Sequence, residues 1–259
     1  MFANERQKII LEMIKENGAA TTAAISKKLC VSVETVRKDL LSLEKNGELL
    51  RVHGGALGLN EKAPNFNLLK RMEFHKKEKT EVSYAAAKLV EESDLIAIDS
   101  GSTATEFIEV LKEKFSKLTI ITASTDVFDS AKNYKNFEII LCGGNFFKEE
   151  NTFFGAFAVE MIKKFHVKKS FIFPSAISLA GGIEIYEKEF YELQKALISI
   201  GEKVIIMADS SKFEKRAFIK TCNITQGQIF VTDSALSPEI KEIYKTNDIN
   251  VIIGGKTNE

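Results

Sequence analysis

The chain has few cysteines and no long apolar run. Its three cysteines lie far apart and form no CxxC or Cys/His spacing, so the sequence predicts neither a metal site nor a redox site at Cys30, Cys142 and Cys222. We expect them to be small, buried core residues in a reducing compartment. No apolar run approaches the roughly 18 residues that a membrane span requires, and the first residues lack a signal-peptide pattern. Both observations lead us to expect a cytoplasmic protein.

An excess of positive charge is also lacking. The 259 residues include 36 Lys and Arg and 36 Asp and Glu, which argues against a protein that coats nucleic acid along its whole surface. Residues 1–58 contain nine basic and seven acidic side chains, a net charge of only +2. Nucleic-acid binding by this part must therefore depend on the placement of charges and on oligomerisation more than on bulk charge. The length favours two domains.

The stretch 31–56 has the pattern of a capped helix followed by a tight hairpin. Ser32 is a good cap, because its hydroxyl can accept a hydrogen bond from an N–H group of the first turn. An apolar stripe follows at helical spacing: Val36, Leu40 and Leu43. The Asn-Gly pair at 46–47 ends the helix, residues 48–53 predict a short strand, and the Gly-Gly pair at 54–55 allows a sharp reversal.

Two further helices are predicted before this stretch, at residues 4–17 and from a cap at Thr21 or Thr22 to Leu29. Residues 1–58 thus form a complete winged helix-turn-helix. In such a domain one helix enters the major groove and the wing reaches the DNA backbone. The polar side chains of the helix start and of the wing are the candidate DNA-binding residues: Ser32, Glu34, Thr35, Arg37, Lys38, Arg51 and His53.

Helices alternate with short apolar strands from residue 77 onward. This alternation predicts a mostly parallel α/β sheet covered on both faces. The strands are expected at 95–98, 118–121, 138–142, 170–173, 204–208, 229–232 and 251–253. The helices are expected at 78–92, 104–115, 127–134, 156–165, 186–201 and 238–244. We expect residues 59–76 to be a linker and residues 77–259 to form the second domain.

Four polar loops follow strands of the predicted sheet, where ligands of parallel sheets bind. The loop 99–105 offers hydroxyl groups, a glycine for close backbone approach and the N–H groups of a helix start, which suit a phosphate. The alternative is an ordinary capped helix start. Each of the other loops has an ordinary structural interpretation as well, as a cap or a solvated lysine. The candidate ligand-binding residues are Asp99, Ser100, Gly101, Ser102, Thr103, Thr105, Thr122, Ser124, Gly143, Gly144, Lys148, Asp209 and Lys212.

The sequence resembles the DeoR-type family of bacterial regulators of sugar metabolism over nearly its whole length. The matching motifs are Val31-Ser32, 35–40, Leu43-Glu44, Gly47, Arg51, 53–56, 99–101, 122–124, Gly143-Gly144 and 209–213. Two positions depart from the family pattern. Lys38 stands where the family usually has an arginine, which makes forked contacts. Ala123 stands where the family usually has an asparagine, which supplies two donors and an acceptor.

The resemblance implies a repressor that binds operator DNA as a homo-oligomer, a dimer or a tetramer, and that responds to a phosphorylated sugar bound in an effector-sensing domain. It adds Lys195 to the candidate effector-binding residues, because the family usually carries a lysine on this helix. A solvated helix lysine is the alternative. No cofactor is implied.

The resemblance also implies a second domain similar in fold to ribose-5-phosphate isomerase. Such an enzyme needs a carboxylate base at its substrate. The stretch 173–178, which corresponds to the acidic cluster of the isomerase, contains no acid, so we expect no catalytic residues and no enzymatic activity. Two alternatives stay open: an isomerase-like enzyme fused to a DNA-binding module, and an α/β domain that only oligomerises.

Overall fold

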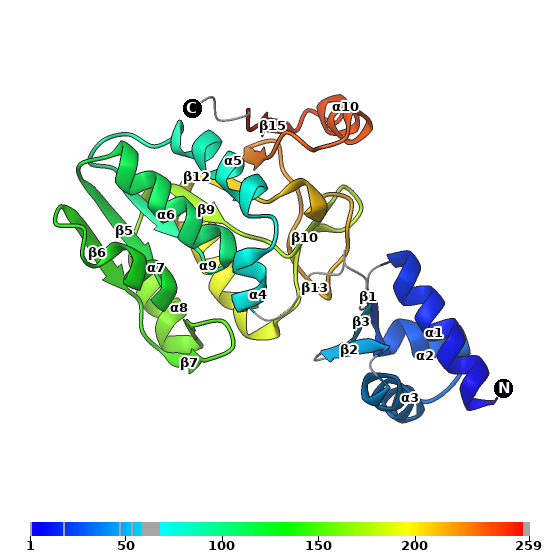
Figure 1. Ribbon diagram of the computed structural model, residues 1–259. Helices are drawn as coiled ribbons and strands as arrows, with labels where there is room; N and C mark the ends of the chain where they lie inside the picture. Colours follow the sequence, from blue (N-terminus) through cyan, green and yellow to red (C-terminus); the bar gives the residue numbers. More distant parts are fainter. Residues whose placement is uncertain (1, 18, 47, 53, 59–67, 256–259) are drawn as a thin grey trace.

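The protein consists of a small helical domain and a larger α/β domain, which a computed structural model shows side by side (Figure 1). The structure describes residues 2–17, 19–46, 48–52, 54–58 and 68–255.

The N-terminal domain contains three helices and a three-stranded sheet. The helices are α1 (Ala3–Asn17), α2 (Thr22–Leu29) and α3 (Val33–Lys45). The strands are β1 (Ala19–Thr21), β2 (Leu49–Val52) and β3 (Gly55–Gly58), all antiparallel in the order β1-β3-β2. The predicted winged arrangement is confirmed, with Gly54 at a φ of +90° in the reversal between β2 and β3. The sequence analysis missed β1, which is too short to show a period.

Helix α3 is fixed at three points by polar side chains. The hydroxyl of Ser32 accepts a hydrogen bond from Thr35 N at 3.1 Å, which confirms the predicted cap. Asp39 is buried in the middle of the helix and accepts two hydrogen bonds from the Arg6 guanidinium of α1, at 2.7 and 3.0 Å. Near the end of α3, Glu44 accepts a hydrogen bond from the backbone N–H of Arg51 at 2.9 Å. The helix and the wing are therefore held as one unit.

The larger domain is built on a seven-stranded parallel sheet in the order β15-β14-β12-β9-β4-β5-β6. Its strands are β4 (Leu95–Ile98), β5 (Leu118–Thr122), β6 (Phe137–Leu141), β9 (Val167–Ile172), β12 (Gly201–Met207), β14 (Gln228–Thr232) and β15 (Asn250–Ile253). Every strand predicted from an apolar run is present. The predicted fold class, mostly parallel α/β after a winged helix-turn-helix, is confirmed.

Helices cover both faces of this sheet (Figure 1). One face carries α5 (Lys76–Ala87), α6 (Ser102–Lys114) and α7 (Thr125–Ala131). The other carries α8 (Ala156–Ile162), α9 (Tyr191–Ile200) and α10 (Pro238–Thr246). A separate buried cluster of apolar side chains fills each interface, which explains why the strands read as nearly continuous apolar runs.

Several short elements were not predicted from the sequence. They are a hairpin of β7 (Asn145–Phe147) with β8 (Thr152–Phe154), and a small sheet of β10 (Ala176–Ser178), β11 (Gly182–Ile185) and β13 (Ile219–Cys222). The predicted helix 186–201 starts later, as a 3₁₀ turn η1 (Lys188–Phe190) followed by α9. Helix α4 (Leu68–Glu73) lies inside the segment that we expected to be a linker. Elements of three to six residues carry too little periodicity to be recognised.

Of the three cysteines that we expected to be buried, Cys142 alone is fully buried. Cys142 is buried and Cys222 is half-buried, but Cys30 is exposed at the end of α2, in a left-handed conformation with a φ of 51°. A helix-ending turn faces solvent, and this position outweighs the apolar neighbours in the sequence. Within the described ranges, no helix combines the length and the apolar character needed to cross a membrane.

Replacing Lys169 with methionine is expected to destabilise the larger domain by about 3 kcal/mol, the lower end for a broken buried ion pair. Its Nζ atom lies 2.5 Å from Asp94 Oδ2, and both side chains are buried. Urea denaturation measures the loss. Lys168→Met is the matched control, because this exposed lysine lies 3.3 Å from the same carboxylate and its loss should cost under about 1 kcal/mol. Equal losses of unfolding free energy from both variants would show that Lys169 and Asp94 do not form a stabilising buried ion pair.

Candidate functional site

A pocket lies where the three neighbouring strands β4, β9 and β12 end. Helices α4, α5 and α9 and the chain after β11 close it. The lining residues are Arg71, Phe74, His75, Lys79, Asp99, Ser100, Gly101, Ser102, Thr103, Glu150, Phe173, Pro174, Ser175, Ile185, Tyr186, Glu187, Phe190, Gln194, Met207, Ala208, Asp209 and Lys212. This is the position at which parallel α/β sheets bind ligands.

The loop after β4 presents a helix start to the pocket. Gly101 has a φ of 145°, which side chains other than glycine rarely adopt, and it turns the chain directly into α6. Because Gly101 has no side chain to cap the helix, the first N–H groups of α6, at Ser102 and Thr103, stay available to a ligand. Backbone N–H groups and the positive end of the helix dipole together favour an anion.

Three cationic side chains from distant parts of the chain meet in the same pocket: Arg71 of α4, Lys79 of α5 and Lys212 of η2 (Ser210–Lys212). The Arg71 guanidinium forms two hydrogen bonds with the Glu150 carboxylate, at 2.9 and 2.5 Å. Burial lowers the pKa of Lys212. An anion that enters the pocket would relieve this unfavourable burial of positive charge.

Lys79 of α5 joins the side of the pocket formed by residues 71–74 to helix α5. It is only 4% exposed, and its ammonium group donates to the backbone carbonyls of Arg71 and Phe74. Burial lowers the pKa of Lys79 to about 8, although the nearby Asp209 acts in the opposite direction. The side chain is therefore charged at pH 7 and loses its proton slightly above that pH.

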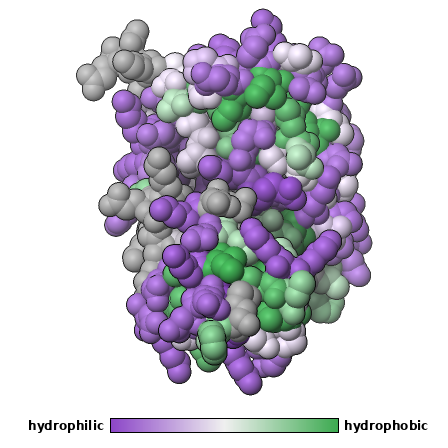
Figure 2. Space-filling model, turned by 90° about the vertical axis from the view of Figure 1, so that its right-hand side faces the viewer, coloured by the Kyte–Doolittle hydropathy of each residue, from purple (hydrophilic) through white to green (hydrophobic). Residues whose placement is uncertain are grey.

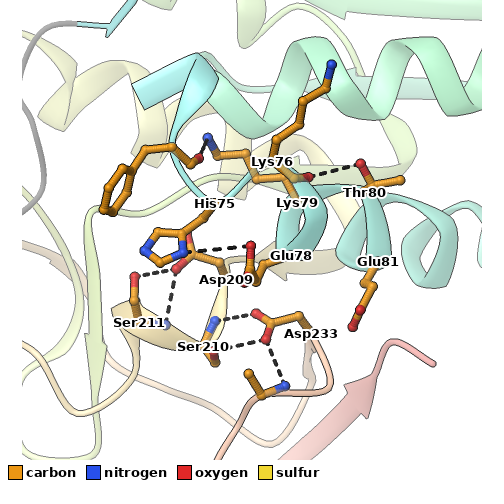
Figure 3. Close-up of polar contacts among 12 residues, drawn as sticks. His75, Lys76, Glu78, Lys79, Thr80, Glu81, Asp209, Ser210, Ser211 and Asp233 are labelled. Carbon is orange, nitrogen blue, oxygen red and sulfur yellow. Dashed lines mark hydrogen bonds and ion pairs between the residues drawn. The ribbon is translucent and has the colours of Figure 1, made fainter. Parts of the chain in front are cut away.

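The loop that carries Lys212 is fixed by two buried carboxylates. Asp209 accepts hydrogen bonds from the backbone N–H and the hydroxyl of Ser211. Asp233 accepts from the N–H and the hydroxyl of Ser210, at 2.5 and 2.9 Å, as Figure 3 shows. These bonds order the backbone between β12 and η2, so that Lys212 is presented to the pocket without a large entropic cost.

Asp99 lies at the floor of the pocket, between the helix start and α9. Its carboxylate accepts hydrogen bonds from Ser100 N at 2.8 Å, Phe173 N at 3.3 Å and Gln194 Nε2 at 2.9 Å. Burial raises the pKa of Asp99 to about 6, against the effect of these hydrogen bonds. The carboxylate is therefore mainly ionised at pH 7.5 and acts there as an acceptor only.

The structure brings together about half of the predicted effector-binding residues. Asp99, Ser100, Gly101, Ser102, Thr103, Asp209 and Lys212 all line the pocket. The remaining ones do not: Thr105, Thr122, Ser124, Gly143, Gly144, Lys148 and Lys195.

The local structure around each of these seven residues explains why it does not line the pocket. Thr122 and Ser124 are buried and order the start of α7, where Ser124 is the cap. Thr105 has turned along α6, and its hydroxyl donates to Ser102 O at 3.2 Å. Gly144 packs against Phe154 and Ala158 beside Gly143. Lys148 is 82% exposed in the β7–β8 hairpin. Lys195 is exposed on α9 and lies over the Tyr191 ring.

Fifteen of the 22 lining residues were not predicted from the sequence, among them the polar residues Arg71, Lys79 and Gln194. Arg71 lies inside the predicted linker, residues 59–76, and was not assigned to the site. Lys79 stands in a run of charged residues that looks like a solvated helix start. Gln194 is the residue next to the predicted Lys195, and a helical turn places adjacent side chains about 100° apart. The correction at α9 is therefore a shift of one residue.

Most of the predicted DNA-binding residues are exposed on the N-terminal domain. Ser32, Glu34, Arg37 and Lys38 are exposed and Thr35 is half-buried at the start of α3, while Arg51 lies on β2 in the wing. His53 lies outside the described residues. Two of these cations already have acidic neighbours, since Arg37 lies 3.4 Å from Glu34 and Arg51 lies 3.6 Å from Glu44.

Hydrophilic residues dominate the visible surface in Figure 2, which also shows hydrophobic patches in its upper and lower parts. One apolar side chain at the helix start, Val33, is 38% exposed and was not predicted. An apolar group at this position is suited to contact with the methyl group of thymine.

Comparison with known proteins decides the family. The model of the DeoR-like helix-turn-helix domain matches residues 6–62, and the model of the DeoR C-terminal sensor domain matches residues 74–234. The chain belongs to the DeoR family. It is a DNA-binding transcriptional regulator.

Relatives of this DeoR-family protein match over nearly its full length. The HTH-type transcriptional regulator YulB of Bacillus subtilis is 30% identical, covering 97% of this chain and 96% of the relative. The lactose phosphotransferase system repressor of Lactococcus lactis is 30% identical, covering 94% and 96%. Among solved structures, ribose 5-phosphate isomerase A of Neisseria gonorrhoeae is 17% identical over 53% of this chain and 54% of its own, with a TM-score of 0.38.

The affinity of the DeoR-family pocket for a phosphate monoester is expected to fall by up to about tenfold between pH 7 and pH 9. Lys79 loses its proton near pH 8, whereas the ligand, with a second pKa near 6, keeps its charge. Calorimetric titration with glucose 6-phosphate measures the effect. Lys79→Arg stays charged at both pH values and should flatten the profile. A wild-type profile without slope would contradict the role of Lys79.

Replacing Arg37 with alanine is expected to weaken operator binding by about 10–100-fold and to relax the base preference at one position. A duplex selected by the wild-type protein from random DNA serves as the operator in a mobility-shift titration. Lys45→Ala removes the same charge from the far end of α3 and should weaken binding less, and equally for all sequences. Identical behaviour of the two variants would overturn the assignment of the recognition helix.

Proposed function

We propose that the protein represses genes of sugar metabolism and is released from operator DNA by a phosphorylated sugar. The observation that supports this effector is the convergence of Arg71, Lys79 and Lys212 on a pocket that also contains the start of α6. A phosphate group can accept hydrogen bonds from all of these donors. The relative from Lactococcus lactis is named a repressor, which supports repression by this chain.

The rest of the pocket suits the sugar part of the ligand. The hydroxyls of Ser100 and Ser175 and the carboxylate of Asp99 offer hydrogen-bonding groups, and the rings of Phe173 and Phe190 offer apolar surface. Sugars present both kinds of surface, hydroxyl edges and C–H faces. A few fixed polar groups in a partly apolar cavity are typical of small-molecule sites.

Two connections support coupling between the pocket and DNA. Arg71 is part of α4, the first described helix after the segment that joins the domains, so a phosphate bound by Arg71 acts on an element beside that segment. The ring of Phe218 lies against Gly55 in the wing and packs edge-on to the Tyr186 ring of the pocket, with ring centres 5.3 Å apart. A ligand that prefers one arrangement of these elements shifts the population toward it.

We propose that the active form is a homo-oligomer, a dimer or a tetramer, because a single winged module buries a small interface on DNA. The division into residues 1–58, 59–76 and 77–259 stays our proposal, with α4 as a helical part of the linker that docks on the larger domain. Binding to bacterial operator DNA implies that the protein works in the cytoplasm.

We also propose that the pocket binds its ligand without turnover. Protein donors already hold three of its carboxylates: Asp99, Glu150 and Asp209. The isomerase-like alternative depends on Glu187, because burial and the nearby Glu150 raise its pKa. Incubation of the protein with ribose 5-phosphate, followed by NMR, should show no ketose. Ketose formation that disappears in Glu187→Gln would favour the enzyme.

At least one of a panel of sugar phosphates is expected to raise the melting temperature of the protein, increasingly with concentration, while its unphosphorylated parent does not. The panel comprises glucose 6-phosphate, fructose 1-phosphate and ribose 5-phosphate. Lys212→Met should weaken the binding about 10–100-fold, the usual loss for a charged hydrogen bond. Lys215→Met removes an exposed lysine three residues further on and should leave the binding unchanged. Equal shifts for sugars and sugar phosphates would contradict a phosphate site.

A further inference from the structure

One polar atom in the pocket is left without a partner. Gln194 is 2% exposed and lines the pocket from α9. Its Nε2 atom donates to Asp99 Oδ2 at 2.9 Å, but its Oε1 atom has no hydrogen-bond partner among the described residues. Buried polar atoms in native proteins are nearly always paired, with protein, water or ligand. An unpaired buried acceptor on a residue that lines the pocket is therefore a candidate for a contact that a ligand completes.

The orientation of the amide is set by Asp99. The ionised carboxylate is an acceptor only, and it already receives the N–H groups of Ser100 and Phe173. Gln194 must therefore turn its NH₂ group toward Asp99, because an oxygen in that place would face another oxygen. While Asp99 is ionised, the reversed amide is disfavoured and Oε1 is held as an acceptor.

Gln194 and its neighbour Lys195, both on α9, face different environments. Lys195, the neighbouring residue, is exposed and lies over the Tyr191 ring, with its Nζ atom 4.8 Å from the ring centre. The pocket thus receives from α9 an uncharged acceptor and no cation. The cations Arg71, Lys79 and Lys212 come from other elements, α4, α5 and η2. Positive charge and the free acceptor therefore belong to different parts of the lining.

We propose that Gln194 determines specificity by accepting a hydrogen bond from a hydroxyl group of the ligand. The inference deepens the proposed function and rests on it. The cations and the N-terminus of α6 bind the phosphate, and Gln194 contacts the sugar part of the ligand. The ligand class is then a phosphate monoester with a hydroxyl donor, a polyhydroxylated chain or ring. A phosphorylated acid whose carboxylate takes that place is disfavoured, because it would face Gln194 Oε1 and the Asp99 carboxylate without a proton to donate.

The test compares ligands that share the phosphate and differ in hydroxyls. Methyl phosphate is the ester without a hydroxyl, and glucose 6-phosphate, fructose 1-phosphate and ribose 5-phosphate carry several. Calorimetry gives the affinity of the full-length protein for each. We expect the best sugar phosphate to bind the wild type at least about tenfold more tightly than methyl phosphate, the value of one good hydrogen bond.

Gln194→Met keeps the length of the side chain and removes the acceptor. It is expected to weaken the best sugar phosphate by about tenfold and methyl phosphate by less than about twofold. Lys195→Met is the matched control on the solvent side of α9 and should change neither. If Gln194→Met fails to fold, Gln194→Lys retains the donor to Asp99 without an acceptor, and the ratio of the two affinities in that variant should fall in the same way.

The outcomes separate the two proposals. Equal losses for both esters, or no loss in Gln194→Met, would overturn the role of Gln194 and leave the phosphate site standing. A wild type that binds methyl phosphate as tightly as every sugar phosphate would overturn it as well. A wild type that binds no ester at all would overturn the proposed function itself, and the inference with it.

Discussion

The buried ammonium group of Lys79 is the interaction on which the pocket depends. It donates to two backbone carbonyls of the segment between α4 and α5, and so fixes the path by which the chain enters the larger domain. That path places Arg71 opposite Glu150 and brings α4 over the start of α6. Without the lysine, the two carbonyls would lose their donor and α4 would lose its attachment to α5.

The general fold and part of the site could be predicted from the sequence, because both depend on local patterns. Apolar runs predicted each strand of the large sheet. The loop 99–103 was predicted to be a binding site from its glycine and hydroxyl residues beside a helix start. Arg71 and Gln194 could not be found in this way. They reach the pocket from elements far from that loop in sequence, and only the packing of α4 and α9 on the sheet decides which side chain of each helix turns inward.

The family motif in the N-terminal domain combines two kinds of residue that a sequence does not distinguish. Arg37 and Lys38 are exposed and available to DNA, whereas Asp39, the next residue, is buried and tied to Arg6. Glu44 similarly braces the wing strand through Arg51. The motif therefore encodes the orientation of the recognition helix as well as its contacts, since a helix that reads bases must be held at a fixed angle.

The pairing of Arg71 with Glu150 has a consequence for sensitivity. This guanidinium already has an anionic partner inside the chain, at 2.5 Å. A phosphate that reaches for Arg71 must compete with that carboxylate, so part of the intrinsic attraction is cancelled before it appears as affinity. Under the proposed function, Glu150 therefore acts as an intramolecular competitor that raises the phosphate concentration needed for binding. A substitution at this one position would change the ligand concentration at which the protein responds while leaving the shape of the pocket intact.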